Sequence, residues 1–261
     1  MNNPFAELRS SWRVVAAAVK GKGHEKTGQP CQDSVHWQAG GEGLLFAALA
    51  DGAGSAKLSE IGSNLAAQTA LRALAESFKT PAALRDDASA KAALKAALET
   101  ALKALTEEAR TRQAKPGDLA TTLLICAAGP DRLAAAQVGD GAVVYAAGGG
   151  SLHALTRPAA GEYLNETVFL TSEGALGRAQ IETWSGRAEQ VALFSDGLQM
   201  LALKMPEAAP HTPFFQPLFG WLERASDLSA ARADLEKLLR SPRVSERTDD
   251  DLTLLLARRM Q

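Results

Sequence analysis

The chain has little cysteine, no excess of positive charge and no long apolar run, and each shortage excludes a class of protein. Two cysteines, Cys31 and Cys126, are too few for a disulfide framework or a multi-cysteine zinc site. The 28 Lys and Arg residues against 30 Asp and Glu give a net charge of -2, without the basic excess typical of nucleic-acid-binding proteins. No apolar run reaches the roughly 18 to 20 residues that span a bilayer, and the N-terminus lacks the pattern of a signal peptide. We therefore expect a cytoplasmic protein that binds neither nucleic acid nor membrane.

What the chain does have is a mixed pattern of short apolar segments and two amphipathic blocks, with 46% hydrophobic residues in 261. The patterns predict strands at 12–19, 44–50, 119–127, 132–138, 142–147, 151–155, 166–171, 180–184, 189–194 and 252–257. They predict helices at 59–78, with Ser59 as N-cap, at a leucine stripe from Leu94 that ends near Arg112, and at 213–225 and 227–240. This order favours an α+β layered fold, and no linker divides the chain, so we expect a single domain over 1–261 with its core at about 12–258.

Acidic residues recur next to these apolar segments. They are Asp51-Gly52 after LLFAALA, Asp140-Gly141 after AAAQVG, Asp196-Gly197 after VALFS, the triple Asp at 249–251 before LTLLLA, and Asp33 in a turn after Gln32. A carboxylate at a strand end is held by a rigid frame, and a following glycine lets the backbone carbonyl approach a ligand. Clustered carboxylates repel one another, and an all-oxygen ligand set suits Mg²⁺ or Mn²⁺ better than zinc. The pattern predicts metal-assisted hydrolysis.

Each Asp-Gly pair also has a simpler interpretation, because this dipeptide is common in hairpin turns. The recurrence of the pairs at strand ends, with the triple Asp, leaves a shared metal cluster and a set of ordinary turns equally open. Residue types alone do not decide between them.

The order of the acidic motifs carries a resemblance to a known family. The segments CQD, ALADGAGS, QVGDG, LFSDGL and DDLTLLL resemble, in order and spacing, the motifs of the metal-dependent PP2C-type serine/threonine protein phosphatases. The resemblance covers roughly residues 12 to 258, and the chain is most similar to the compact bacterial branch of the family. It implies an α-β-β-α sandwich, in which two antiparallel sheets are flanked by helices. That architecture agrees with the predicted order of elements.

The resemblance implies a binuclear metal centre. Asp51 would bridge two Mn²⁺ or Mg²⁺ ions about 3.5 to 4 Å apart, as two-metal hydrolytic sites require. The carbonyl of Gly52 would bind one ion, and Asp196 and Asp250 would complete the first metal site.

It also implies roles for two further aspartates and for water. Asp33 would hold water in the metal shell, and Asp140 would lie near a third, weakly bound ion. The nucleophile would be a metal-bridging water that attacks the phosphomonoester without a covalent enzyme intermediate.

The chain departs from the family pattern at several positions, three of which bear on the choice between an enzyme and a pseudo-phosphatase. Gly28 stands where eukaryotic members carry a phosphate-binding Arg, Gln32 replaces an acidic residue, and Ala53 replaces a His that would be a general acid. His24 and Lys26 in the loop GKGHEKTGQP are the nearest substitutes for phosphate binding, although His24 could equally be an ordinary exposed loop histidine.

The leading hypothesis is a protein serine/threonine phosphatase that is monomeric and acts on a phosphorylated protein with a cognate Ser/Thr kinase. The alternative is a pseudo-phosphatase that serves as a regulatory or partner-binding module, which the three departures favour. The presence of Asp51, Asp196 and Asp250 together favours the enzyme, because a scaffold has no need of clustered carboxylates.

Overall fold

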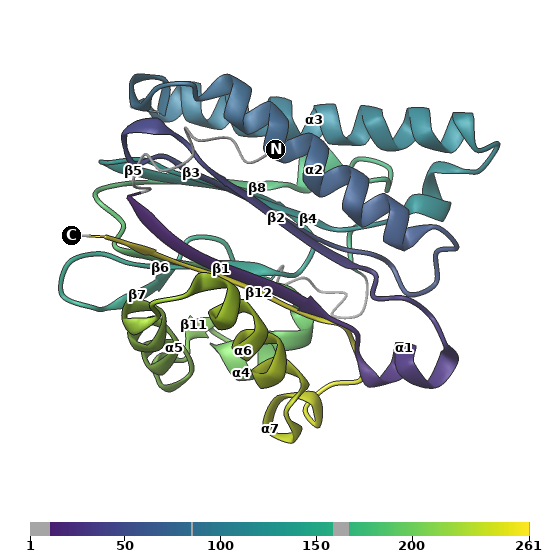
Figure 1. The fold of residues 1–261 in the computed structure, drawn as a ribbon. Coiled ribbons are helices and arrows are strands. Elements are labelled where there is room, and N and C mark those ends of the chain that lie inside the picture. Colours follow the sequence, from purple (N-terminus) through teal and green to yellow (C-terminus); the bar gives the residue numbers. More distant parts are fainter. Residues whose placement is uncertain (1–10, 85, 159–166, 261) are drawn as a thin grey trace, which may run out of the picture.

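Two antiparallel sheets of five strands each form the centre of the described part of the protein (Figure 1). The computed structural model describes residues 11–84, 86–158 and 167–260. One sheet has the order β2 (Asp33–Ala39), β3 (Leu45–Asp51), β4 (Leu123–Ala128), β5 (Arg132–Val138) and β8 (Gln180–Ser185). The other has the order β1 (Trp12–Val19), β12 (Leu252–Arg259), β9 (Gln190–Phe194), β6 (Ala142–Ala146) and β7 (Leu152–Ala154).

The sheets pack face to face because their central strands are apolar on both sides. In β3, Leu45, Ala47 and Leu49 face the core between the sheets, while Phe46 and Ala48 face the helices outside. Alternate side chains of a strand point to opposite faces, so a strand buried on both faces becomes a continuous apolar run. This is why LFAALA could be identified as a strand from the sequence.

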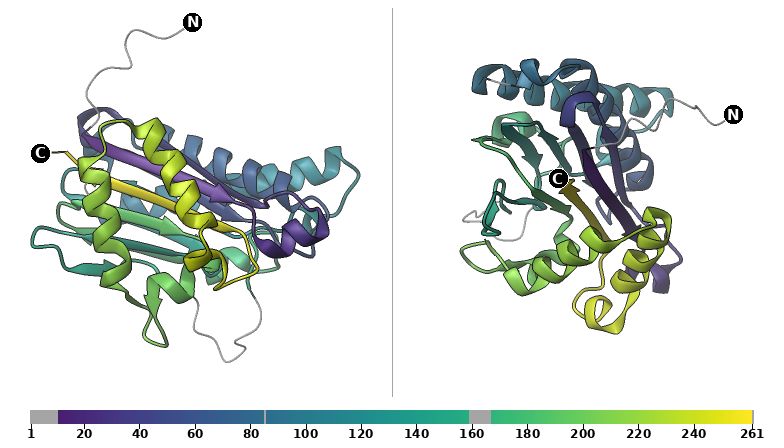
Figure 2. Two further views of the ribbon diagram at one scale, coloured as in Figure 1. Left: turned by 60° about the horizontal axis from the view of Figure 1, so that its bottom comes forward. Right: turned by 60° about the vertical axis from the view of Figure 1, so that its left-hand side comes forward.

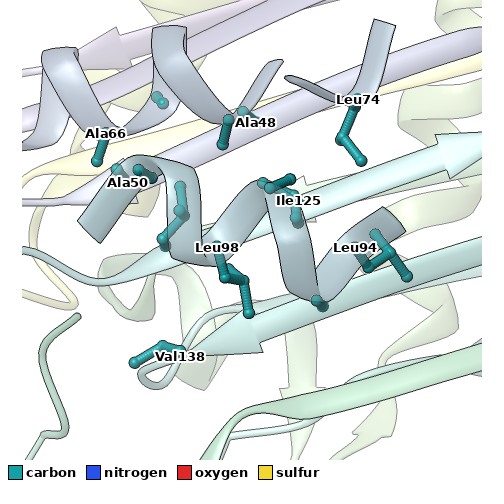
Figure 3. Close-up of a cluster of buried hydrophobic side chains, with 14 of the residues drawn as sticks. Ala48, Ala50, Ala66, Leu74, Leu94, Leu98, Ile125 and Val138 are labelled. Atoms are coloured by element: carbon teal, nitrogen blue, oxygen red, sulfur yellow. The ribbon is translucent and has the colours of Figure 1, made fainter. Parts of the chain in front are cut away.

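A pair of helices covers the outer face of each sheet (Figures 1 and 2). Helices α2 (Ser59–Ser77) and α3 (Asp87–Thr111) lie on the first sheet, and α5 (Thr212–Arg224) and α6 (Leu228–Arg240) lie on the second. Figure 3 shows the first helical layer, where the small side chains of α2 and the leucines of α3 pack on β3, β4 and β5. Small buried residues such as Ala66 let α2 approach the sheet closely.

These four layers confirm the predicted α-β-β-α class. The shorter elements are α1 (Lys22–Thr27), α4 (Gln199–Ala202), α7 (Pro242–Ser245), β10 (Leu203–Lys204), β11 (Ala209–Pro210) and five 3₁₀ turns at Gly41–Gly43, Pro81–Leu84, Pro116–Leu119, Ala175–Arg178 and Asp196–Leu198. Within the described residues, none of the helices combines the length and the hydrophobicity needed to cross a bilayer.

Several local predictions are wrong. Ser59 is the first helical residue rather than the N-cap of α2, because Leu58 occupies the cap and the Ser59 hydroxyl donates to the carbonyl of Ala56. β4 begins at Leu123 rather than 119, since Pro116–Leu119 forms a 3₁₀ turn. Of the strand expected at 166–171, the described residues 167–171 are irregular.

Asp33 also differs from its predicted position in a turn. It is the first residue of β2 and pairs with Asp51 at the end of β3. Two carboxylates of the predicted site are thereby opposite each other in one antiparallel ladder.

Candidate active site

Four of the predicted aspartates meet at one end of the two-sheet sandwich. In the first sheet, Asp51 ends β3 beside Asp33 at the start of β2. In the second sheet, Asp196 follows β9 and Asp250 precedes β12, and these two strands are antiparallel neighbours. Antiparallel pairing places the end of one strand beside the start of its neighbour. Each sheet therefore brings two carboxylates together at the same end of its strands.

Hydrogen bonds between the two sheets connect these strand ends at Asp33. Its Oδ2 accepts hydrogen bonds from the hydroxyl of Ser195 at 2.8 Å and from the hydroxyl of Thr253 at 2.6 Å. Ser195 directly follows β9, and Thr253 lies near the start of β12 in the second sheet. Neither Ser195 nor Thr253 was predicted from the sequence. Their proximity to Asp33 depends on sheet packing, and only their positions beside Asp196 and the triple Asp could have drawn attention to them.

Burial and mutual repulsion disfavour ionisation of these carboxyl groups. Asp33 is 9% exposed, and burial raises its pKa to about 7, with the Thr253 hydrogen bond opposing and the charge of Asp251 adding to the increase. Burial raises the pKa of Asp51 well above its ordinary value, and the charges of Asp33 and Asp196 contribute. The cluster is therefore costly to keep ionised without a cation.

Burial and repulsion also raise the pKa values of the two carboxyl groups at the strand ends of the second sheet. Burial raises the pKa of Asp196 to about 6, with repulsion from Asp140 as the next cause. Burial also raises the pKa of Asp250, while a hydrogen bond from the Asp251 backbone N–H lowers it. The interaction between the carboxyl groups of Asp51 and Asp196 raises the pKa of Asp51 and lowers that of Asp196.

The chemistry of the cluster fits a hard divalent cation. The donors are oxygens, and Oδ1 of Asp33 and Oδ1 of Asp196 are buried without a hydrogen-bond partner in the described part of the chain. Carboxylate oxygens of this kind suit Mg²⁺ or Mn²⁺. Among the described residues, no three His, Cys, Asp or Glu side chains already have the spacing of a complete ligand set. A cation would have to draw the carboxylates closer together.

Asp140 lies at the rim of this cluster, in the loop after β5. Its Oδ2 accepts a hydrogen bond of 2.6 Å from Thr167. The side-chain amide of Gln137 donates to the carbonyls of Gly139 at 3.0 Å and Gly141 at 2.8 Å, so a buried side chain fixes the loop on both sides of Asp140.

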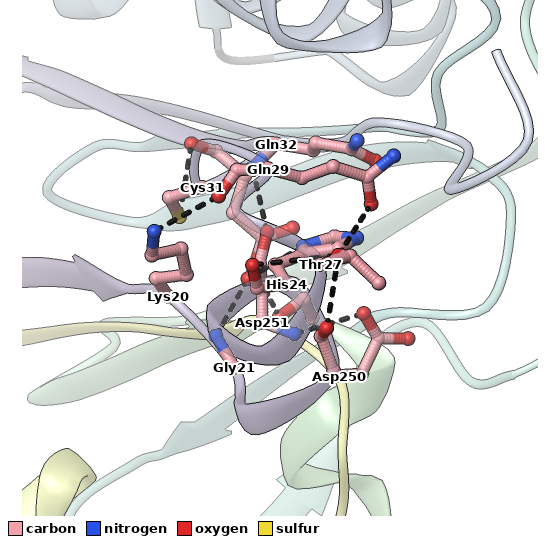
Figure 4. A network of polar contacts seen from close by, with 12 residues as sticks. Lys20, Gly21, His24, Thr27, Gln29, Cys31, Gln32, Asp250 and Asp251 are labelled. Carbon is pink, nitrogen blue, oxygen red and sulfur yellow. Dashed lines mark hydrogen bonds and ion pairs between the residues drawn. The ribbon is translucent and has the colours of Figure 1, made fainter.

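Asp251 organises the chain around the site, and the sequence analysis did not single it out from the triple Asp. It is 1% exposed, and its carboxylate accepts from the backbone N–H groups of Gly21 at 2.7 Å and Gln32 at 2.6 Å (Figure 4). Its Oδ1 also lies 3.0 Å from Nδ1 of His24. Asp251 therefore ties together the end of β1, helix α1 and the start of β2.

The two predicted phosphate-binding side chains lie in different surroundings. The His24 side chain is 13% exposed and contacts Asp251. Lys26 is 71% exposed and lies 3.3 Å from Oδ1 of the equally exposed Asp249, at the surface. Gly28 ends α1 with φ of 72°, a left-handed conformation that an arginine would adopt only with strain.

Comparisons with known proteins identify the family and the fold. A model of the protein phosphatase 2C family matches residues 20–240. Serine/threonine-protein phosphatase 3 of Escherichia coli is 39% identical over 254 residues, which is 95% of this chain and 98% of that protein. The crystal structure of the serine/threonine phosphatase Stp1 from Staphylococcus aureus has a TM-score of 0.62 at 15% identity and covers 100% of both chains. The phosphatase PstP/Ppp of Mycobacterium tuberculosis has a TM-score of 0.59 at 19% identity, over 96% of this chain and 99% of that one.

Proposed function

From the premise that the chain belongs to the protein phosphatase 2C family, we propose that the acidic cluster is the active site of a serine/threonine protein phosphatase. The observation that carries this proposal is the group of buried carboxylates at the end of the sandwich, whose pKa values are raised by burial and by one another. Such perturbed groups gather where a site is built for chemistry. The substrate is a phosphoserine or phosphothreonine monoester in a protein.

The family is metal-dependent, and the acidic cluster supplies the ligands. We propose that Asp51, Asp196, Asp250 and the carbonyl of Gly52 hold two Mn²⁺ or Mg²⁺ ions, with Asp140 beside a third that binds weakly. When bound, such cations lower the pKa of coordinated water and neutralise phosphate oxygens.

The other side chains of the site orient water and substrate. The hydroxyls of Ser195 and Thr253 fix Oδ2 of Asp33, so its buried Oδ1 is left to accept a hydrogen bond from water. His24 and Lys26 are proposed to face the substrate phosphate, and the ion pair of Lys26 with exposed Asp249 is weak enough to be exchanged for a phosphate.

The remaining proposals concern context. Residues 12–258 act as one catalytic domain, the protein is a monomer in the cytoplasm, and a cognate Ser/Thr kinase supplies its phosphoprotein substrate. The two cysteines are unpaired in the structure, which agrees with a reducing compartment.

The function is tested by phosphate release from a phosphothreonine peptide with Mn²⁺, with Mg²⁺ and with excess EDTA. We expect release with metal that is abolished by EDTA and by Asp196→Asn, and unchanged by Asp131→Asn, which removes an exposed carboxylate at the other end of β5 from Asp140. Activity retained in Asp196→Asn would contradict the site assignment. Faster turnover of sugar phosphates or nucleotides than of the peptide would assign a small-molecule phosphatase instead.

A further inference from the structure

His24 lies beside a carboxylate that is itself fixed in orientation. Both oxygens of Asp251 accept backbone N–H groups, from Gly21 and from Gln32, so this buried carboxylate has little freedom to rotate. Nδ1 of His24 lies 3.0 Å from Oδ1 of Asp251 (Figure 4). The two atoms are poorly aligned for a hydrogen bond, as is frequent in enzymes without bound substrate, and a protonated ring would form an ion pair with Asp251 at this distance.

The other ring nitrogen faces the active-site loop. A Cβ atom placed on Gly54 would lie 3.9 Å from Nε2 of His24, and Gly54 belongs to the loop that directly follows Asp51. The His24 ring is also close enough to Asp250 for its positive charge to lower the pKa of that carboxyl. The imidazole therefore lies between buried Asp251 on one side and the rim of the acidic cluster on the other.

We propose that His24 is the general acid that protonates the leaving Ser or Thr oxygen, and that Asp251 is its positioning residue. The inference rests on the proposed phosphatase function and assigns His24 a proton-donating role rather than phosphate binding. It supplies the group that Ala53 cannot, since Ala53 has no proton to donate. In the protonated ring, one N–H points to Asp251 and the other remains available to the substrate.

The step balances as a hydrolysis. As the water oxygen bonds to phosphorus, the bond from phosphorus to the Ser or Thr oxygen breaks, and its electron pair stays on that oxygen. His24 gives its Nε2 proton to this oxygen, so the product leaves as a neutral hydroxyl. The attacking water loses a proton, and solvent returns one to the ring. One water is consumed and one inorganic phosphate is released in each turnover.

The other histidines of the chain are engaged elsewhere. His36 contacts Asn64 at 3.0 Å, His153 lies against the ring of Tyr145, and Nδ1 of His211 lies 3.1 Å from the carbonyl of Leu201. Among the described residues, His24 is thus the histidine that the contacts place beside the acidic cluster.

The test uses two substrates that differ in their need for a general acid. The nitrophenolate released from p-nitrophenyl phosphate is stable as an anion, whereas the alkoxide of threonine needs a proton as it leaves. We expect His24→Ala to lower kcat for a phosphothreonine peptide roughly 100-fold to 10,000-fold, while kcat for p-nitrophenyl phosphate falls by less than about 5-fold. We expect free imidazole to restore part of the lost peptide turnover. The matched control is His153→Ala, which should leave both activities unchanged.

Asp251→Asn tests the positioning role. We expect it to reduce peptide turnover more than p-nitrophenyl phosphate turnover, because it disturbs the ring orientation without removing the ring. A melting temperature measured for each variant separates this effect from loss of the fold.

The outcomes distinguish the inference from the function on which it rests. Equal losses for both substrates in His24→Ala, with an increased KM, would overturn the general-acid role and favour phosphate binding. An undiminished kcat together with an unchanged KM for the peptide would exclude His24 from both roles. Absence of metal-dependent turnover in the parent protein would instead overturn the proposed function, and the inference with it.

Discussion

The metal-free protein should lose stability as pH rises, because its buried carboxyl groups are more stable protonated than ionised. Asp33 has an ordinary pKa of 3.8 and a pKa of about 7 in the fold. Its contribution to folding stability is therefore complete below about pH 4 and is lost as pH rises through about 7. At roughly 1.4 kcal/mol per pH unit, the loss is about 4 kcal/mol by pH 8, of which about 3 kcal/mol falls between pH 5 and pH 8. That is a large part of a typical stability of about 5–15 kcal/mol.

Urea unfolding in EDTA, followed by circular dichroism at several pH values, measures this effect. Asp33→Asn cannot ionise and keeps an oxygen to accept from Ser195 or Thr253, so we expect it to be more stable than the parent at pH 8 and to lose this advantage towards pH 4. Asp131→Asn, at the surface, should follow the parent at every pH. A parent protein that is as stable at pH 8 as at pH 5, or an Asp33→Asn variant whose curve runs parallel to the parent's, would refute the reasoning.

Three further predictions concern the metal, a buried arginine and a close backbone contact. Mn²⁺ at about 100 times its Kd should stabilise the metal-free parent by roughly 2.7 kcal/mol at pH 8, and the gain should be absent from Asp196→Asn when melting is followed by calorimetry; equal gains in both would contradict the assignment. Arg259→Met should cost roughly 3 kcal/mol in urea unfolding, because the buried carbonyls of Ala188 and Gly129 lose the Arg259 donor, whereas that of Gly43 keeps Trp12. Gly62→Ala should cost roughly 1–3 kcal/mol, since its Cβ would overlap the carbonyl of Leu119, whereas Gly117→Ala should change stability by less than about 0.5 kcal/mol because its Cβ meets open space within the described part of the chain.

The fold was predictable where local pattern and tertiary packing agree. LFAALA is apolar throughout, and LTLLLA is apolar except at Thr253, because both faces of β3 and β12 are covered, and that pattern is visible in the sequence. β2 was missed because DSVHWQA mixes charged, polar and aromatic residues, and its extended conformation comes from pairing with β3 along its whole length. Such pairing is a property of tertiary structure that local propensity does not contain.

The site was predictable in its residue types but not in its contacts. Asp51, Asp196 and Asp250 could be identified because each flanks an apolar strand. In the run at 249–251, nothing in the sequence distinguishes exposed Asp249, which contacts Lys26, from Asp251, which is buried against Gly21 and Gln32. That difference depends on where β12 meets the end of β1, and the pairing of these strands joins residues more than 200 positions apart.

The energetic cost of the acidic cluster bears on the choice between an enzyme and a partner-binding module. Four carboxylates come from four separate strand ends in both sheets, and burial raises the pKa of each one. A protein that served only to bind a partner would be more stable with amides or apolar residues at these four positions. Replacing the carboxylates would remove their mutual repulsion without disturbing either helical layer. Of the replaced positions, Gly28 and Ala53 concern substrate phosphate and proton transfer, and Gln32 removes one negative charge from the shell of the second metal, whereas Asp51, Asp196 and Asp250 are all present. Residues around the acidic cluster thus differ from the family pattern, while the carboxylates of the cluster itself are present. This combination favours an enzyme over a partner-binding module.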